Sequence, residues 1–314
     1  MRPLMAALAV VVFALCACGE SSEYPAKDIT VVIPYNPGGG FDTYVRALAP
    51  GLEAQFPGDV NVLPKNLPGA GGRRGASDVY RARPDGYTIG VFNLPGVLIP
   101  TLQDIPTEYD LSRVTWLATI GYDSYVFVVK GDWPVTSIDD LRQMGRVITY
   151  GAPGPGSTSF VATRIVNETL GIPFEIITGY KGSSEYMLGL IRGDFDAAMI
   201  STAGARAYLE SGDIKAIAVF GTDSEDPAIA DAADLGAPEL GELRLVHMIG
   251  APPDLPAGVR EILERALLAA MEDGRFTAWL EETGNEVQPA DAAQTTMAVA
   301  EMTRFYDQFK SLLD

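Results

Sequence analysis

The sequence is poor in the residues on which many enzymes and metal proteins depend. Its 314 residues include one histidine and two cysteines, and both cysteines, Cys16 and Cys18, lie near the N-terminus. The rest of the chain therefore has no cysteine nucleophile, no disulfide framework and no cysteine-ligated metal. With a single histidine, most zinc sites are excluded as well. We expect no metal, no cofactor and no enzymatic activity.

Positive charge is also scarce. There are 23 Lys and Arg residues against 41 Asp and Glu, which gives a formal net charge of −18. Recognition of nucleic acid needs clustered Lys and Arg, and adhesion to an anionic bilayer needs a basic patch, so we expect neither. A small anionic ligand remains possible, because backbone dipoles can create a local positive field in an acidic protein.

The N-terminus has the features of a targeting signal. Arg2 precedes an unbroken apolar run from Leu4 to Ala17, which is too short to span a bilayer comfortably and is typical of a signal peptide. Leu15-Cys16-Ala17-Cys18 then matches a bacterial lipobox, in which Cys18 carries the lipid. An ordinary signal peptide cleaved nearby is the alternative. The lipoprotein interpretation predicts a signal peptide over residues 1–17, a tether over 18–25 and a lipid-anchored, extracytoplasmic protein.

Three glycine-rich turns follow predicted strands. Ile29 to Pro34 predicts a buried strand, and Gly38-Gly39-Gly40 leads from it into a helical pattern that begins at Asp42. Similar turns lie at 69–72 and 154–156. Ligands of open α/β sheets bind at the carboxyl ends of the strands, where helix N-termini offer free N–H groups to an anion. Together the turns predict a ligand clamped between two units, although any one of them is also explained by plain turn chemistry.

Strand and helix patterns alternate along the chain, which predicts an α/β fold. The first unit reads βαβαβ and implies a parallel sheet. The stretch from Trp116 to Lys130, interrupted near 121–124, is placed to leave one sheet and enter another. We expect a discontinuous first domain over 26–123 plus 246–314, a second over 124–245, two crossover strands and a ligand cleft between the domains. The predicted strands span 29–34, 60–63, 87–92, 147–150, 174–177, 197–200, 215–220 and 243–250; the helices span 42–56, 73–83, 137–144, 157–170, 184–192, 203–210, 257–271, 276–282 and 290–313.

Two features refine the predicted helices. Pro50-Gly51 interrupts the helical pattern that begins at Asp42, so a kink or an early stop is expected there. Ser137 is the expected N-cap of the helix over 137–144, with Asp140 at the capping-box position.

Nucleotide binding and catalysis find no support in the motifs. No Gly-Lys-Ser/Thr follows any of the turns, so a P-loop is absent. A dinucleotide G-x-G-x-x-G fingerprint fails because Thr43 or Arg74 occupies its last position. The histidine, His247, lies on an apolar predicted strand, and we expect a core or strand-edge residue with a satisfied nitrogen rather than a catalytic base.

Four charged residues have two interpretations each. Asp42 can cap its own helix, and it can also order water or accept a hydrogen bond from a ligand. Arg73 and Arg74 follow the second turn, and Lys181 follows a strand of the second unit. Helix arginines usually face water, which we favour here, but one of these cations could bind a ligand carboxylate.

At these positions the sequence resembles the Bug, or TctC-like, extracytoplasmic solute receptors of tripartite tricarboxylate transporters. Asn66 to Gly72 (NLPGAGG) matches a family motif except at Leu67, where the family usually has Arg. Phe160 stands where many members have His, and Arg73-Arg74 replace a commonly uncharged pair. The matching blocks occur in order along nearly the whole chain after the tether: 24–42, 66–72, 84–88, 150–157, 180–182 and 251–256.

This resemblance implies a two-domain type II periplasmic-binding-protein fold that closes over a carboxylate without chemistry. It implies a monomer that binds a di- or tricarboxylate, or a related organic acid, and delivers it to membrane transporter subunits. A receptor that presents its ligand to a sensor kinase is the alternative, and a secreted hydrolase or isomerase is a weaker one, because only His247 is available as a base. Carried over by position, the ligand-binding residues are Tyr35, Gly39, Gly40, Phe41, Asp42, Ala70, Gly71, Asn93, Ser157, Thr158, Tyr180 and Ser201.

Overall fold

The computed structural model describes residues 24–155, 157–283 and 287–313. The predicted signal peptide, the lipid site Cys18, most of the tether and Gly156 lie outside the described residues. Within the described ranges, no helix combines the length and the apolar character that crossing a membrane requires.

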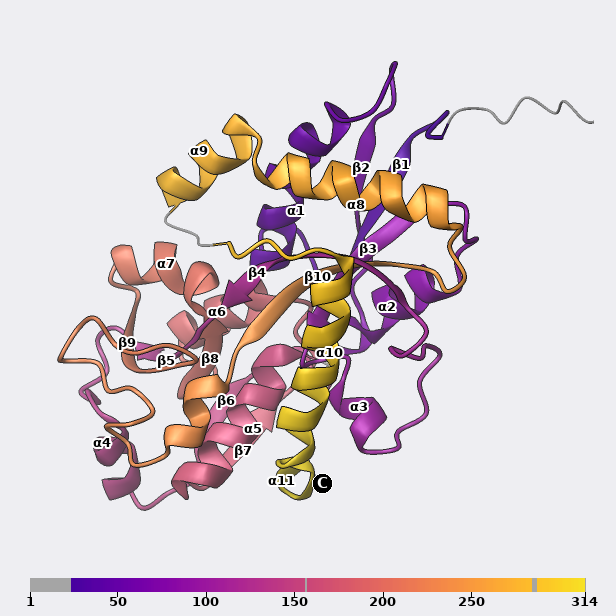
Figure 1. The fold of residues 1–314 in the computed structure, drawn as a ribbon. Coiled ribbons are helices and arrows are strands. Elements are labelled where there is room, and N and C mark those ends of the chain that lie inside the picture. The colour runs from indigo at the N-terminus through magenta and orange to yellow at the C-terminus, as the bar shows by residue number, and fades with distance from the viewer. Residues whose placement is uncertain (1–23, 156, 284–286, 314) are drawn as a thin grey trace, which may run out of the picture.

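The first sheet has the strand order β2-β1-β3-β10-β4. Strand β1 (Ile29–Ile33) pairs in parallel with β2 (Val62–Asn66) and with β3 (Thr88–Leu94), as the βαβαβ pattern predicts. Strand β10 (Leu245–Ala251) runs antiparallel between β3 and β4 (Thr115–Asp123). A strand from late in the chain therefore completes the sheet that the N-terminal part begins (Figure 1).

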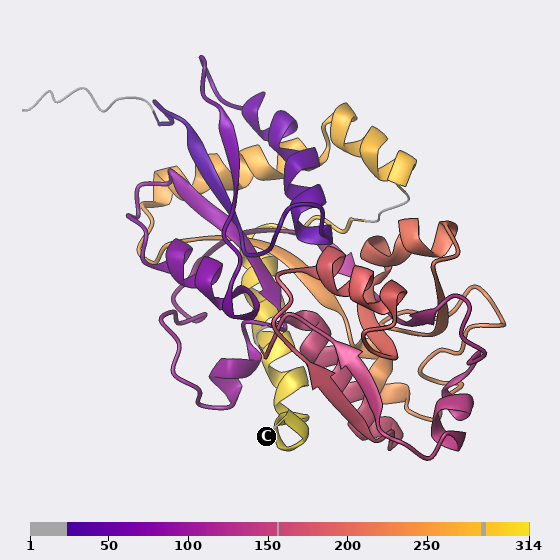
Figure 2. The same cartoon turned by 180° about the vertical axis from the view of Figure 1, so that it is seen from behind.

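The second sheet has the order β7-β6-β8-β5-β9 and the same plan. Strand β6 (Ile148–Gly151) is parallel to β7 (Phe174–Ile177) and to β8 (Ala197–Ser201). Strand β5 (Tyr125–Lys130) runs antiparallel between β8 and β9 (Ile214–Phe220). The view from behind shows the two sheets in separate parts of the molecule (Figure 2). The predicted α/β class is confirmed.

The chain passes between the sheets at two places. Strand β4 ends at Asp123 in the first sheet, and β5 begins at Tyr125 in the second, so Ser124 alone separates them. The return lies between β9 and β10 and contains the short helix η3 (Pro238–Glu242). The extended stretch over 116–130 thus divides between two sheets where its pattern is interrupted.

The helices cover both sheets. In the first unit, α1 (Gly40–Glu53) packs against α8 (Ala257–Met271) and α9 (Gly274–Thr283), and α2 (Arg73–Tyr80) packs on β3. In the second, α5 (Thr158–Leu170) and α6 (Ser183–Arg192) pack on β8, as does α7 (Thr202–Glu210). The remaining described helices are η2 (Ala70–Gly72), α3 (Ile99–Leu102), α4 (Ile138–Gln143), α10 (Ala292–Asp307) and α11 (Lys310–Leu313).

Several element boundaries differ from the sequence prediction. Pro50 lies inside α1, which continues to Glu53, so an early stop there is wrong. Helix α1 also begins at Gly40, because glycine in the turn tolerates the first helical position. The helix predicted over 290–313 is two helices, α10 and α11. The capping box of Ser137 and Asp140 on α4 is confirmed.

Candidate functional site

A cavity of about 50 Å³, here called the inner cavity, lies between the two sheets. Segments that follow β1 and β6 line it, together with residues of β5, β8 and β10. From the first-sheet side come Tyr35, Gly39, Gly40, Phe41, Leu245 and His247; from the second-sheet side come Tyr125, Pro153, Ser157, Thr158, Ser159, Ser183, Tyr186, Ile200 and Ser201.

A second cavity of about 310 Å³, here called the outer cavity, shares Tyr35 and Pro153 with the inner one. Its first-sheet wall is the glycine turn 69–72 with Arg73, and its second-sheet wall is 153–155 with 178–181. The two cavities are therefore neighbouring compartments of one cleft between the sheets.

The structure gathers most of the predicted ligand-binding residues in this cleft. Those that line the inner cavity are Tyr35, Gly39, Gly40, Phe41, Ser157, Thr158 and Ser201. Those that line the outer cavity are Ala70, Gly71 and Tyr180. Asp42 and Asn93 line neither, although both lie directly behind lining residues.

On the first-sheet side, the start of α1 faces the inner cavity. Gly39 is the N-cap, and its carbonyl accepts the N–H groups of Asp42 at 3.0 Å and Thr43 at 3.1 Å. The amides of Gly40 and Phe41 precede these first helical donors, so no intrahelical acceptor is available to them. The positive end of the α1 dipole adds to their attraction for an anion.

On the second-sheet side, serines begin the helices. Ser157 caps α5 by accepting the N–H of Phe160 at 3.3 Å, and Ser201 caps α7 by accepting the N–H of Gly204 at 3.0 Å. Ser183 is the first residue of α6. The inner cavity thus receives helix N-termini from both sheets, while no Asp, Glu, Lys or Arg of the described residues lines it. Such a site favours a small anion through dipoles rather than through a fixed charge.

The two sides of the cleft touch each other. The amide of Asn36 donates to the carbonyl of Lys181 at 3.3 Å, which joins the first glycine turn to the second unit. A Cβ on Gly39 would lie 3.0 Å from the Ser183 hydroxyl, so a side chain at this position would require that hydroxyl to shift. The two units are therefore in direct contact across the cleft.

Two buried polar atoms of the inner cavity have no hydrogen-bond partner among the described residues: the Tyr125 hydroxyl and His247 Nδ1. Their residues are 0% and 2% exposed. Burial lowers the pKa of His247 to about 3, so its imidazole is neutral. Buried polar atoms are normally hydrogen-bonded, and these two face the compartment that a ligand would enter.

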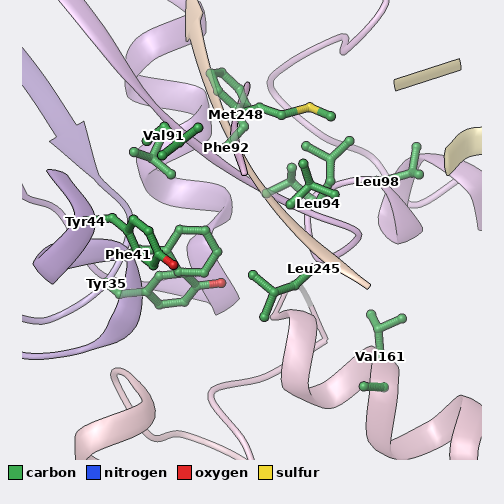
Figure 3. Close-up of a cluster of buried hydrophobic side chains, with 14 of the residues drawn as sticks. Tyr35, Phe41, Tyr44, Val91, Phe92, Leu94, Leu98, Val161, Leu245 and Met248 are labelled. Carbon is green, nitrogen blue, oxygen red and sulfur yellow. The ribbon is translucent and has the colours of Figure 1, made fainter. Parts of the chain in front are cut away.

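His247 corrects the sequence analysis in part. It is a buried residue of β10, as expected, but its Nδ1 is not satisfied and its ring lines the cavity. The ring lies 4.6 Å from that of Phe41 and 4.5 Å from that of Tyr44. Figure 3 shows Tyr35, Phe41 and Tyr44 beside one another, with Leu245 across from them. Because β10 comes from a distant part of the sequence, no local pattern connected His247 with the first turn.

Asp42 stabilises the turn from behind. Its side chain is buried, and its carboxylate accepts the N–H of Gly38 at 2.9 Å, Arg46 Nε at 2.9 Å and Asn66 Nδ2 at 2.8 Å. Burial raises its pKa, but the hydrogen bonds from Arg46, Gly38 and Asn66 together hold the pKa below its usual range. Asp42 therefore joins the first turn to the residue that opens the second one.

Asn93 stabilises Tyr35 in a similar way. Its amide nitrogen donates to the Tyr35 hydroxyl, which donates to the carbonyl of Gly71 at 3.2 Å. Gly72 has a φ of +102°, and a Cβ there would lie 3.0 Å from both the Tyr35 hydroxyl and Asn93 Oδ1. Only glycine allows the second turn to pack this closely on the pair.

Asp123, at the end of β4, has an environment opposite to that of Asp42. Burial raises its pKa to about 7, against the lowering effect of hydrogen bonds from Ser201 and from the amides of Ala203, Ser124 and Thr202. One of its oxygens, Oδ2, has no partner among the described residues. Asp123 lines a further cavity of about 410 Å³ together with Asp223, Glu225 and Asp226. Sequence analysis did not single it out.

The three cations considered as ligand contacts lie at different positions relative to the cavities. Arg73 and Lys181 line the outer cavity, whereas Arg74 is exposed and lines neither compartment. Sequence analysis missed Tyr125, Ser183, Tyr186 and Leu245, which carry no motif of their own. Across the part of the chain that the structure describes, no group of three or more His, Cys, Asp or Glu residues is arranged to hold a metal ion.

Comparisons with known proteins agree with this architecture. The family model described as "Tripartite tricarboxylate transporter family receptor" matches residues 45–308. A relative from Agrobacterium vitis, a UPF0065 protein in the TAR-I ttuE-ttuC' intergenic region, is 30% identical over 80% of this chain and 73% of its own. The structure of the periplasmic binding protein BugD covers 92% of this chain and 98% of its own, with a TM-score of 0.81 and 25% identity. An R. palustris protein solved with adipate covers 92% and 98%, with a TM-score of 0.80 and 22% identity.

Proposed function

The chain belongs to the tripartite tricarboxylate transporter receptor family, and we propose on that premise that it captures a small organic carboxylate by closing its two units over it. It is a solute-binding receptor rather than an enzyme, as are its family and its structural neighbours. The recognition of the Bug and TctC-like family from sequence motifs is confirmed.

One observation carries the proposal. The inner cavity lies between the sheets, has no charged side chain among the described residues of its wall and receives the N-termini of α1, α5, α6 and α7. A carboxylate placed there accepts backbone N–H and serine hydroxyl hydrogen bonds from both units at once. The adipate in a protein of the same fold is consistent with a carboxylate ligand.

The proposed mechanism is a population shift between open and closed forms. Only the closed form brings the amides of the first turn and the hydroxyls of Ser157 and Ser201 to the same compartment, so the ligand binds that form more tightly. Closure also forms the hydrogen bond between Asn36 and Lys181 and excludes water from the cavity. Neither step requires a nucleophile or a base.

We further propose that the protein is held outside the cytoplasm by a lipid on Cys18 and delivers its ligand to the membrane subunits of a tripartite tricarboxylate transporter. The lipobox and the family support this. In cells given a clickable fatty acid, the wild-type chain should become labelled and Cys18→Ser should not. Equal labelling of the two chains would contradict the anchor.

Isothermal titration tests the binding proposal. The folded chain without residues 1–17 should bind at least one member of a panel of mono-, di- and tricarboxylates, and the corresponding neutral amide should not bind. Small-angle scattering should show a smaller radius of gyration with that ligand. If no carboxylate binds to protein that unfolds cooperatively, the proposed function is wrong.

A further inference from the structure

The three cavities on or near the cleft differ sharply in charge. Within the described part of the chain, no Asp, Glu, Lys or Arg lines the inner cavity, and Arg73 and Lys181 but no acid line the outer one. The cavity beside Asp123 has the reverse character, with four acidic residues and no Lys or Arg. In a chain with a formal net charge of −18, a compartment whose charged residues are all cationic is a local exception.

Arg73 is held at the wall of the outer cavity by its own turn. Its Nε donates to the carbonyl of Ala70 at 3.2 Å, which folds the side chain back over the turn 70–73. Among the described residues, no carboxylate forms an ion pair with Arg73, although the neighbouring helix residue Asp78 pairs with Lys65 and Arg81 pairs with Glu108. The end of the guanidinium keeps donors for a planar acceptor.

Lys181 approaches the same compartment from the other side. Its backbone N–H donates to Glu185 at 2.6 Å and its carbonyl accepts from Asn36, so the residue is fixed at the line where the two units touch. Its side chain is exposed, and no carboxylate of the described residues pairs with it. An anion in the outer cavity would therefore have a cation from each unit beside it.

The inner and outer cavities share Tyr35 and Pro153 in their walls. A ligand that passes Tyr35 would place one carboxylate among the helix N-termini of the inner cavity and its other end in the outer one. The inner cavity distinguishes an anion from a neutral group, but it does not distinguish a ligand with one acidic group from a ligand with two.

Resting on the proposed function, we propose that Arg73, assisted by Lys181, forms an outer anion subsite that makes the protein selective for ligands with a second acidic group. Arg73 is the specificity-determining residue of this subsite, because its planar fork matches a carboxylate in two hydrogen bonds. Lys181 adds attraction across the cleft as a point charge, and both cations favour closure when the second acid is present.

The experiment compares dicarboxylates with monocarboxylates of the same length. Isothermal titration of the chain without residues 1–17 would use succinate against butyrate, glutarate against pentanoate, and adipate against hexanoate. In the wild type, the better dicarboxylate should bind at least tenfold more tightly than its partner. Arg73→Gln should weaken that dicarboxylate about tenfold or more and leave the monocarboxylate within about threefold.

Two further variants separate a specific contact from general electrostatics. Arg74→Gln removes the same charge from an exposed position outside both cavities, so it should leave the preference for dicarboxylates intact. Arg73→Lys keeps the charge without the fork, and it should recover only part of the dicarboxylate affinity.

Each result decides something different. Binding of both ligand types with equal affinity, or an unchanged dicarboxylate affinity in Arg73→Gln, would overturn the subsite while the proposed function stands. Equal losses of dicarboxylate affinity in Arg73→Gln and Arg74→Gln would also overturn the subsite, because they would show a long-range effect of charge. Absence of any carboxylate binding would overturn both proposals.

Discussion

The two sides of the inner cavity are built from different chemical groups. The first-sheet side presents backbone amides of the turn at Gly39, Gly40 and Phe41, with little side-chain polarity apart from Tyr35 and His247. The second-sheet side presents hydroxyls, from Ser157, Ser201 and Tyr125 among others. Amides at a helix start bind any carboxylate in much the same way, whereas side-chain hydroxyls change position and number with the sequence. Within the inner cavity, we therefore expect the first-sheet side to supply affinity for any carboxylate and the second-sheet side to respond to the rest of the ligand, separately from the Arg73 subsite of the outer cavity.

Two carboxyl groups of the first unit lie close to helix starts, and they have opposite properties. Asp42, near the start of α1, has a lowered pKa because hydrogen bonds from Arg46, Gly38 and Asn66 outweigh its burial. Asp123, near the start of α7, has a raised pKa because burial outweighs its hydrogen bonds and no cation is among its partners. Position at a helix start therefore does not fix the charge of an acid; its other partners do.

The largest expected effect comes from filling the close approach of the two sides. Gly39→Val should weaken ligand binding at least about a hundredfold, because its side chain would occupy the space of the Ser183 hydroxyl in the closed form. Gly39 has a φ of −90°, which valine adopts without strain, so the loss of a favourable N-cap residue is the main expected cost and the midpoint of thermal unfolding without ligand should fall by only a few degrees. Isothermal titration and thermal denaturation measure the two quantities.

A second pair of variants provides the control. Gly39→Ala adds a single methyl group and should weaken binding less than Gly39→Val. Adding Ser183→Ala to Gly39→Ala should restore part of the loss, judged against Ser183→Ala alone. If the double variant binds as weakly as independent losses predict, the two positions do not meet on closure.

The next effect concerns the two carboxyl groups. A raised pKa in the folded state means that Asp123 costs the folded protein stability as pH rises from about 4 toward 7. Asp123→Asn should therefore be more stable than the wild type at pH 8, by about 2 kcal/mol in the free energy of unfolding. The difference should disappear at about pH 3, where both the folded and the unfolded carboxyl are protonated. Urea unfolding across this pH range measures it.

Asp42→Asn is the matched control and should have the opposite sign. Because the pKa of Asp42 is lowered, its stabilising contribution is present above about pH 4 and is lost as pH falls through the folded value. The variant should lose about 1 to 2 kcal/mol at pH 7, since one acceptor becomes a donor facing Arg46 or Gly38. Changes of the same sign in the free energy of unfolding of both variants would remove the contrast between the two carboxyl groups.

The smallest expected effect tests whether the first-sheet side contributes selection after all. His247→Leu removes the unpartnered Nδ1 and should weaken binding of the best carboxylate about tenfold. His247→Asn can place an amide near the position of Nδ1 and should bind within about threefold of the wild type. The pKa of about 3 predicts no contribution from His247 to the pH dependence of binding between pH 5.5 and 8. Full affinity in His247→Leu would show that this nitrogen meets no ligand.

The sequence predicts the parts of the site that lie in local motifs. The turn around Gly38 to Asp42 and the helix start beside Ser157 are found where the glycine patterns place them, because a strand, a turn and a helix start are encoded within a few residues. Family resemblance added Tyr180 and Ser201, which line the cleft without a strong local signal.

The parts that the sequence leaves unresolved depend on tertiary packing. Asp42 and Asn93 carry polar groups beside the right strands, yet only the fold shows that their hydrogen bonds point to Arg46 and Tyr35 behind the cavities. His247 reaches the first turn because β10 inserts between β3 and β4, and an antiparallel insertion from late in the chain has no local signature. The same reason explains why Asp123, at a crossover, was not singled out.

The last two helices also change how the two units can move. Helix α10 packs on β4 of the first sheet, while α11, only three residues further along, packs on α5 of the second unit. Tyr306 donates to the carbonyl of Arg244 at 3.0 Å, which fixes the end of α10 beside the returning segment. A hinge made of two strand crossings alone would swing freely. We therefore expect a rotation of the two units to slide α11 along α5, so that this contact resists opening of the cleft.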